Sequence, residues 1–101
     1  LAKKRFREEL YKDWDYKCAY CGDDATSLDH IIPKYRSGCS SRHNLVPACT
    51  KCNSNKASEK METWFEQQSF FSVEKLNSIL YWMESNTLEF IDIALRHPRS
   101  V

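Results

Sequence analysis

Apolar side chains recur at every fourth position near the beginning of the chain, at Phe6, Leu10 and Trp14. Because an α-helix has 3.6 residues per turn, this spacing predicts one apolar stripe on an amphipathic helix over residues 3–14. The first turns of that helix carry four cations, Lys3, Lys4, Arg5 and Arg7. Cations at this end oppose the helix dipole. The basic end is therefore either simply solvated or directed at a phosphate partner.

Two short apolar runs in the middle of the chain predict two strands. The run LDHII covers residues 28–32 and is closed by Pro33, and the run NLVP covers residues 44–47. Proline cannot donate to a β-ladder, so the first strand should end before it. Between the two runs lies a polar, basic loop with the sequence KYRSGCSSRH. The segment after the second strand, ACTKCNSNKAS, predicts a helix that begins within its cysteine pair.

The pattern beyond Ser58 is helical. A first helix is expected around EKMETWFEQQ, and a second from about Val73 to Met83. In the second, apolar residues occupy the i, i+3, i+4 and i+7 positions of a buried face, at Leu76, Ile79, Leu80 and Met83. A last helix is expected through LEFIDIALR, because NTLE has the spacing of a capping box and Pro98 would end the helix.

The chain has 101 residues, which argues for one domain with a modest core. Its formal net charge of +1 neither favours nor excludes a polyanionic partner. The charge is unevenly distributed, however. Residues 1–56 hold eleven Lys and Arg against seven Asp and Glu, whereas residues 57–101 hold four against seven. A general cationic surface is thus excluded, and any attraction for nucleic acid must come from a local basic patch in the first half.

Four of the five cysteines form two close pairs, Cys18 with Cys21 and Cys49 with Cys52. Two C-x2-C pairs supply four thiolates, the ligand set that tetrahedral Zn2+ prefers. Two disulfides are the alternative, but the cysteine count is odd and no secretory signal is visible. The sequence therefore predicts a structural zinc site. Cys39, alone in its loop, is expected to be a free thiol.

The chain has no apolar run that approaches the length of a membrane span. Its first residues, LAKKRFREEL, form a charged amphipathic segment rather than a secretory signal. A cytoplasmic location is the simplest expectation for these 101 residues. Leu1 is not an initiator methionine, and a signal upstream of it would change this expectation.

Asp29 and His30 lie side by side in the first predicted strand. Adjacent residues on a strand point to opposite faces, so these two are poorly placed to share one metal ion. A carboxylate is a hard oxygen ligand that suits Mg2+ or Mn2+. A neutral imidazole suits proton abstraction near neutral pH. A metal on one side and a base on the other are what hydrolysis of a phosphodiester requires.

Several residues together resemble a known family. The pair DH at 29–30, Asn44 in RHNLVPAC, and Asn53 with Lys56 in CTKCNSNK are similar to the HNH nucleases, also called ββα-metal nucleases, in their zinc-knuckle form. The resemblance covers about residues 16–67. The order of these residues, the enclosing cysteines and the final lysine all match.

The resemblance implies a role for each matching residue. His30 would be the general base, and Asp29 with Asn53 would hold the catalytic metal. Asn44 would brace the loop that joins the two strands, and Lys56 would face a phosphate. Asn53 stands where the family name has a histidine, as in the HNN members of the family. Its amide oxygen shifts the expected metal towards Mg2+ or Mn2+.

The implied fold is α+β, with a ββα-metal (His-Me finger) motif stapled by a four-cysteine zinc site. The chain, residues 1–101, would be one HNH nuclease domain with an N-terminal helix at 1–15, a zinc-stapled core at 16–57 and a helical extension at 58–101. The implied activity is that of a metal-dependent DNA endonuclease. Further contacts to DNA would come from five side chains, Lys34, Arg36, Arg42, His43 and Lys56.

Two other functions stay open at this point. One is a non-catalytic zinc module that binds nucleic acid, in which Asp29 and His30 are only a structural pair. The other is an RNase that uses the same site. The resemblance implies the cytoplasm of a bacterium or of a phage-infected host cell and no membrane partner, and it leaves monomer and homodimer undecided.

Overall fold

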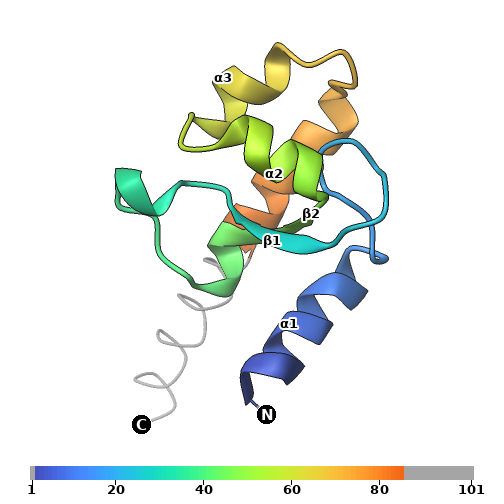
Figure 1. Ribbon diagram of the computed structural model, residues 1–101, viewed down its shortest axis with the longest axis vertical. Coiled ribbons are helices and arrows are strands. Elements are labelled where there is room, and N and C mark those ends of the chain that lie inside the picture. Colours follow the sequence, from blue (N-terminus) through green and yellow to red (C-terminus); the bar gives the residue numbers. More distant parts are fainter. Residues whose placement is uncertain (1, 86–101) are drawn as a thin grey trace, which may run out of the picture.

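The computed structural model describes residues 2–85 (Figure 1). The expected last helix, His97 and Pro98 lie outside the described residues. The elements in order are α1 (Ala2–Asp13), β1 (Ser27–His30), the 3-10 turns η1 (Lys34–Arg36) and η2 (Arg42–Asn44), β2 (Leu45–Ala48), α2 (Thr50–Lys56) and α3 (Met61–Glu66). A further helix covers 73–85. The order and type of these elements confirm the predicted small α+β fold.

Helix α1 follows the predicted apolar stripe but buries mainly one residue of it. Leu10 is fully buried, whereas Phe6 is substantially exposed. Trp14 lies one residue beyond the helix, and its ring meets Trp82 edge-to-face with centroids 5.5 Å apart. Asp15 and Tyr16 both have positive φ, which turns the chain sharply after the helix. The stripe therefore anchors α1 at its C-terminal end.

The two strands form an antiparallel pair in which Ser27 lies opposite Ala48 and His30 lies opposite Leu45. All of β2 is buried, as its apolar sequence predicts. Pro47 has no N–H to donate, but its carbonyl accepts a hydrogen bond from Ala19 N at 2.9 Å. The segment between the first two cysteines is thereby attached to the sheet. In Figure 1, α2 crosses over the sheet.

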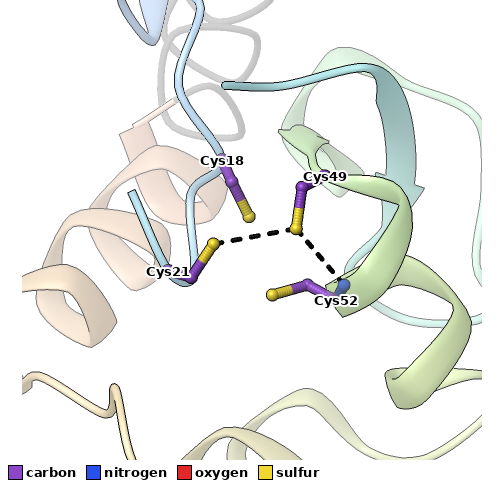
Figure 2. A group of neighbouring side chains, drawn as sticks. All are labelled: Cys18, Cys21, Cys49 and Cys52. Atoms are coloured by element: carbon purple, nitrogen blue, oxygen red, sulfur yellow. Dashed lines mark hydrogen bonds between the residues drawn. The ribbon is translucent and has the colours of Figure 1, made fainter. Parts of the chain in front are cut away.

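The first cysteine pair lies in a tight knuckle, and the second pair lies at the start of α2 (Figure 2). Gly22, at φ +86°, supplies the left-handed turn after Cys21. Cys49 is the N-cap of α2, and its sulfur accepts a hydrogen bond from Cys52 N. This confirms that the second pair straddles a helix start.

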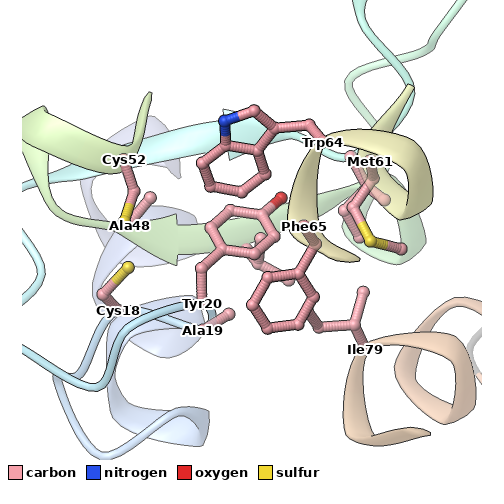
Figure 3. Close-up of a cluster of buried hydrophobic side chains, with 11 residues drawn as sticks. Cys18, Ala19, Tyr20, Ala48, Cys52, Met61, Trp64, Phe65 and Ile79 are labelled. Carbon is pink, nitrogen blue, oxygen red and sulfur yellow. The ribbon is translucent and has the colours of Figure 1, made fainter. Parts of the chain in front are cut away.

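An aromatic core fills the space between the knuckle, the sheet and α3. Figure 3 shows Tyr20 between Trp64 and Phe65. The Tyr20 ring meets them edge-to-face, with centroids 5.0 Å and 5.5 Å away. Trp64 Nε1 donates to Asn55 Oδ1 at 2.7 Å, which fixes α3 against α2. The helix at 73–85 contributes Ile79, which is fully buried, so its predicted apolar face is confirmed.

Over residues 2–85, none of the helices combines the length and the apolar character needed to cross a membrane.

Candidate active site

The four paired cysteines gather their sulfur atoms within 4.8 Å of one another (Figure 2). All five cysteines of the chain are free thiols in the structure, so neither pair forms a disulfide. Four sulfurs around a tetrahedral zinc, each about 2.3 Å from it, lie about 3.8 Å apart. The Sγ atoms of Cys21 and Cys49 are 3.7 Å apart. The cluster thus has the donors and the spacing to hold Zn2+.

The surroundings of the cluster also suit a metal. Backbone N–H groups of Asp23 and Cys52 point at Cys21 Sγ and Cys49 Sγ, at 3.4 Å and 3.3 Å. Such donors orient metal-bound thiolates. Burial raises the pKa of Cys21 to about 11, and burial together with the neighbouring sulfurs raises that of Cys52. As thiolates, four sulfurs at this spacing would repel one another, and a dication at their centre would supply the compensating charge.

Asp29 points from β1 into the protein and is almost completely buried. The Tyr20 hydroxyl donates to Asp29 Oδ2 at 2.6 Å, and Lys56 Nζ lies 3.2 Å from the same oxygen. Burial raises the pKa of Asp29, while the Lys56 charge and the Tyr20 hydrogen bond oppose that rise. Within residues 2–85, both of these contacts end on Oδ2. Oδ1 is thus left as the oxygen that can bind a metal.

Lys56 does not face outward, so the prediction that it contacts a phosphate is wrong. Its side chain is fully buried, and Nζ donates to the His30 carbonyl oxygen at 2.9 Å. A buried cation needs a negative partner, which the Asp29 carboxylate provides. Lys56 ends α2 where this short helix passes across β1, and from there it binds both Asp29 and His30. It supports the site from beneath.

His30 lies next to Asp29 on the strand, and its ring is half-buried. Its Nε2 is 3.0 Å from Ser40 Oγ. Desolvation lowers the pKa of His30, and the nearby charge of Lys34 lowers it further. A lowered pKa keeps the imidazole neutral near neutral pH, which is the protonation state of a base. With Ser40 on Nε2, the nitrogen available to a substrate is Nδ1.

Asn44 braces the loop between the strands, as the resemblance implied. Its Oδ1 accepts from Ile32 N at 2.8 Å, and its Nδ2 donates to Ile32 O at 2.9 Å and to Cys39 O at 2.7 Å. One buried amide thereby closes the loop at both ends. Asn44 holds the backbone that follows His30 and does not itself reach outward.

Asn53 lies on α2 against the same strand that carries Asp29 and His30. Its Nδ2 donates to Ser27 Oγ at 3.0 Å and to Leu28 O at 3.3 Å. Because the amide nitrogen of Asn53 bonds to the strand, its amide oxygen Oδ1 is available to another partner. None of the hydrogen bonds among residues 2–85 ends on it. Asn53 Oδ1 and Asp29 Oδ1 are therefore the two oxygen donors that the site can offer to a hard cation.

The remaining basic residues of the loop have different surroundings. Arg42 pairs with Asp13 and lies over the Trp82 ring at 4.8 Å, which gives it a structural role between α1 and the helix at 73–85. His43 Nε2 lies 3.7 Å from the exposed Cys39 sulfur. Arg36 Nε donates to Ser58 O at 2.8 Å. Lys34 is exposed and has no ion pair with any described residue.

Two residues of the site were not anticipated from the sequence, Tyr20 and Ser40. Tyr20 lies between Cys18 and Cys21, but its contact with Asp29 becomes apparent only when the knuckle packs against β1 in the fold. Ser40 is one of three serines in SGCSS, and nothing in the pattern distinguishes it.

The sequence that forms the cysteine cluster, the two strands and the crossing helix is similar to known proteins. Residues 18–59 match the family model described as HNH endonuclease. This segment, which we call the HNH module, is similar to the HNH endonuclease family. The module contains the four cysteines, Asp29, His30 and Asn53, which confirms the resemblance.

Two relatives of this HNH module were found among curated proteins. A CRISPR-associated endonuclease Cas9 of Corynebacterium diphtheriae is 30% identical over 84 residues, which cover 75% of this chain and 8% of that protein. A CRISPR-associated endonuclease Cas9 of Actinomyces naeslundii is 34% identical over 55 residues, which cover 50% of this chain and 5% of that protein. The chain thus spans under a tenth of the length of these relatives.

Proposed function

We propose that the HNH module hydrolyses phosphodiester bonds of DNA, with His30 as the general base and one Mg2+ or Mn2+ ion. The observation that carries this proposal is the pairing on β1 of an imidazole held by Ser40 with a carboxylate that has one oxygen without a hydrogen bond. The family match and the two nuclease relatives support it.

His30 removes a proton from the attacking water through Nδ1. For this, the ring proton lies on Nε2, which donates a hydrogen bond to Ser40 Oγ. The lone pair of Nδ1 is then free to accept the proton of the water. Asp29 Oδ1 and Asn53 Oδ1 would hold the ion. A bound Mg2+ or Mn2+ stabilises negative charge on the phosphate and on the leaving oxygen. Lys56 and Tyr20 keep Asp29 ionised and aligned from below.

The charge distribution supports a polyanionic substrate at this face. From His30 to Ser58 the sequence contains no Asp or Glu and five Lys and Arg, of which Lys56 is buried and Arg42 is paired with Asp13. Two of these, Lys34 and Arg36, follow His30 directly in the loop that Asn44 closes. Phosphate contacts from such residues position a strand without reading its sequence.

A plasmid relaxation assay with the purified chain tests this proposal. We expect cleavage when Mg2+ is added and none when it is omitted. His30→Ala should lower the rate by about 100-fold or more, the range for loss of a general base. His97→Ala is the matched control, because it removes a histidine outside the HNH module, and it should cut like the parent. Zinc content and circular dichroism of both variants must match the parent.

If His30→Ala cleaves as fast as the parent, the catalytic role of His30 is wrong and a binding-only module is favoured. Parallel incubations with single-stranded DNA and with RNA separate the DNase from the RNase. Cleavage of RNA alone would replace DNA as the substrate and leave the roles of the site residues in place.

A further inference from the structure

The loop that follows His30 is closed at its two ends and carries a single aromatic residue, Tyr35, in its tight turn. Asn44 joins Ile32 to Cys39 at the base of the loop through three hydrogen bonds. The segment between them contains η1, in which Tyr35 is the middle residue. A loop closed at its base by a buried amide holds its turn in a defined place relative to the strand.

The turn within this loop is tight. Both Arg36 N and Gly38 N donate to Pro33 O, at 2.8 Å and 2.9 Å. Ser37 adopts a left-handed conformation at φ 69°. A Cβ at Gly38 would lie 1.7 Å from Ile32 O, so the chain folds back on itself too closely for any other residue. The loop is thus built to one shape.

What this shape presents is Tyr35. This residue is 85% exposed, the largest value among the exposed large hydrophobic residues of the described chain. Lys34 and Arg36 flank it, and the Arg36 bond to Ser58 O ties the turn to the end of α2. The Tyr35 ring is therefore held in solvent between two cations, and it does not contribute to the core of this chain. The ring is available to a partner.

The turn also lies beside the catalytic base. His30 precedes the loop, and Ser40, which follows Cys39, contacts the His30 ring. The loop thus begins directly after His30 and returns to the His30 ring at Ser40. Tyr35 is five residues from His30 along the chain, a reach of at most about 17 Å. That distance spans a few nucleotides of a bound strand.

We propose that Tyr35 stacks on an unpaired base of the nucleic-acid strand in the active site, while Lys34 contacts a neighbouring phosphate. The absence of acidic residues from His30 to Ser58 favours a polyanion over a protein as the partner. Bases in a regular duplex are stacked on one another and offer no free face. An aromatic platform instead suits a single-stranded or locally opened strand. The inference rests on the proposed function and names its substrate class as unpaired nucleic acid.

The test uses the whole 101-residue chain and a short single-stranded DNA that contains 2-aminopurine, an adenine analogue whose fluorescence is quenched by stacking. Divalent cations are omitted so that no cleavage occurs. We expect the parent to bind, to quench the fluorescence, and to prefer the single strand to the matching duplex. Tyr35→Leu should weaken binding by about 5- to 100-fold and abolish the quenching. Tyr35→Phe, which keeps the ring, should retain both.

Tyr81→Leu is the matched control, because Tyr81 is also strongly exposed, at 72%, but lies on the acidic helix at 73–85. It should bind like the parent. Lys34→Gln should reduce the slope of log K against log salt concentration by about one, which corresponds to the loss of one phosphate contact. The quenching should be unchanged.

The proposal is overturned if Tyr35→Leu binds and quenches like the parent, or if the parent binds the duplex with equal or greater affinity. These outcomes leave the proposed function standing. Conversely, the chain could show quenching that depends on Tyr35 and yet cleave no nucleic acid. That result would support the stacking proposal and refute only the nuclease proposal.

Discussion

The hydroxyl of Tyr20 donates a 2.6 Å hydrogen bond to Asp29 Oδ2, and this bond joins the cysteine knuckle to β1. Tyr20 lies between Cys18 and Cys21, so its position depends on the turn that these two cysteines define. The oxygen that it binds belongs to the carboxylate proposed to hold the catalytic ion. The cysteine cluster and the candidate active site are therefore parts of one arrangement.

Tyr20→Phe tests this connection. The variant keeps the ring in its aromatic core but removes the donor to a buried carboxylate, which should lower the free energy of unfolding by about 1.5–3 kcal/mol. Cleavage should fall because Asp29 is less well aligned, while the zinc content stays at the parent value. Urea unfolding, a Mg2+ titration of cleavage and elemental analysis measure these three effects. Tyr16→Phe is the control, since Tyr16 is exposed and should change none of them. An unchanged Mg2+ response in Tyr20→Phe would show that Asp29 does not need this bond.

Removal of zinc should unfold the module. Binding of a structural zinc contributes on the order of 10 kcal/mol, which is comparable with the whole stability of a small domain. We expect about one zinc per chain, and we expect a soft chelator to abolish the folded circular dichroism spectrum, which added Zn2+ restores. A reducing agent alone should have no effect, because the structure contains no disulfide. A chelated chain that stays folded would contradict a structural role for the metal.

The buried Lys56 gives a third prediction. Lys56→Met leaves the Asp29 carboxylate buried without its cation, which should cost about 3–5 kcal/mol of stability. In Lys56→Met with Asp29→Asn, the uncompensated charge is gone and much of that loss should be recovered. Chemical denaturation of the parent, the two single variants and the double variant measures the coupling. A phosphate-contacting lysine would behave differently: its removal would leave stability unchanged and reduce only the salt dependence of DNA binding.

Lys56 also shows where inference from the sequence stops. The cysteine spacing, the strand pattern and Asn44 predicted the cluster, the sheet and the loop brace, because each depends on local geometry or on ligand chemistry. A lysine at the end of a short helix is ordinarily solvated. Whether it points outward or beneath a strand depends on how α2 crosses β1, which no periodicity encodes.

Tyr20 and Ser40 were missed for the same reason. Each contacts a residue of the candidate site nine or ten positions away in the sequence, across a turn whose shape only the fold determines. The metal-binding role of Asp29 and Asn53 and the catalytic role of His30 stay predictions. They now have a specific geometry to test, with one free oxygen on each proposed ligand.

Ser40 supplies the last prediction, because it determines which nitrogen of His30 is free. In the parent, NMR of the imidazole nitrogens at a pH above neutrality should show mainly the tautomer with the proton on Nε2. Ser40→Ala removes the acceptor, so both tautomers should be populated and the ring should reorient more freely. We expect kcat to fall several-fold with little change in KM, since substrate contacts are kept. Ser41→Ala is the control, because Ser41 makes no contact with His30 among the described residues, and it should preserve the parent tautomer. A parent ring protonated mainly on Nδ1 would place the base on the other nitrogen and contradict the proposed path of the proton.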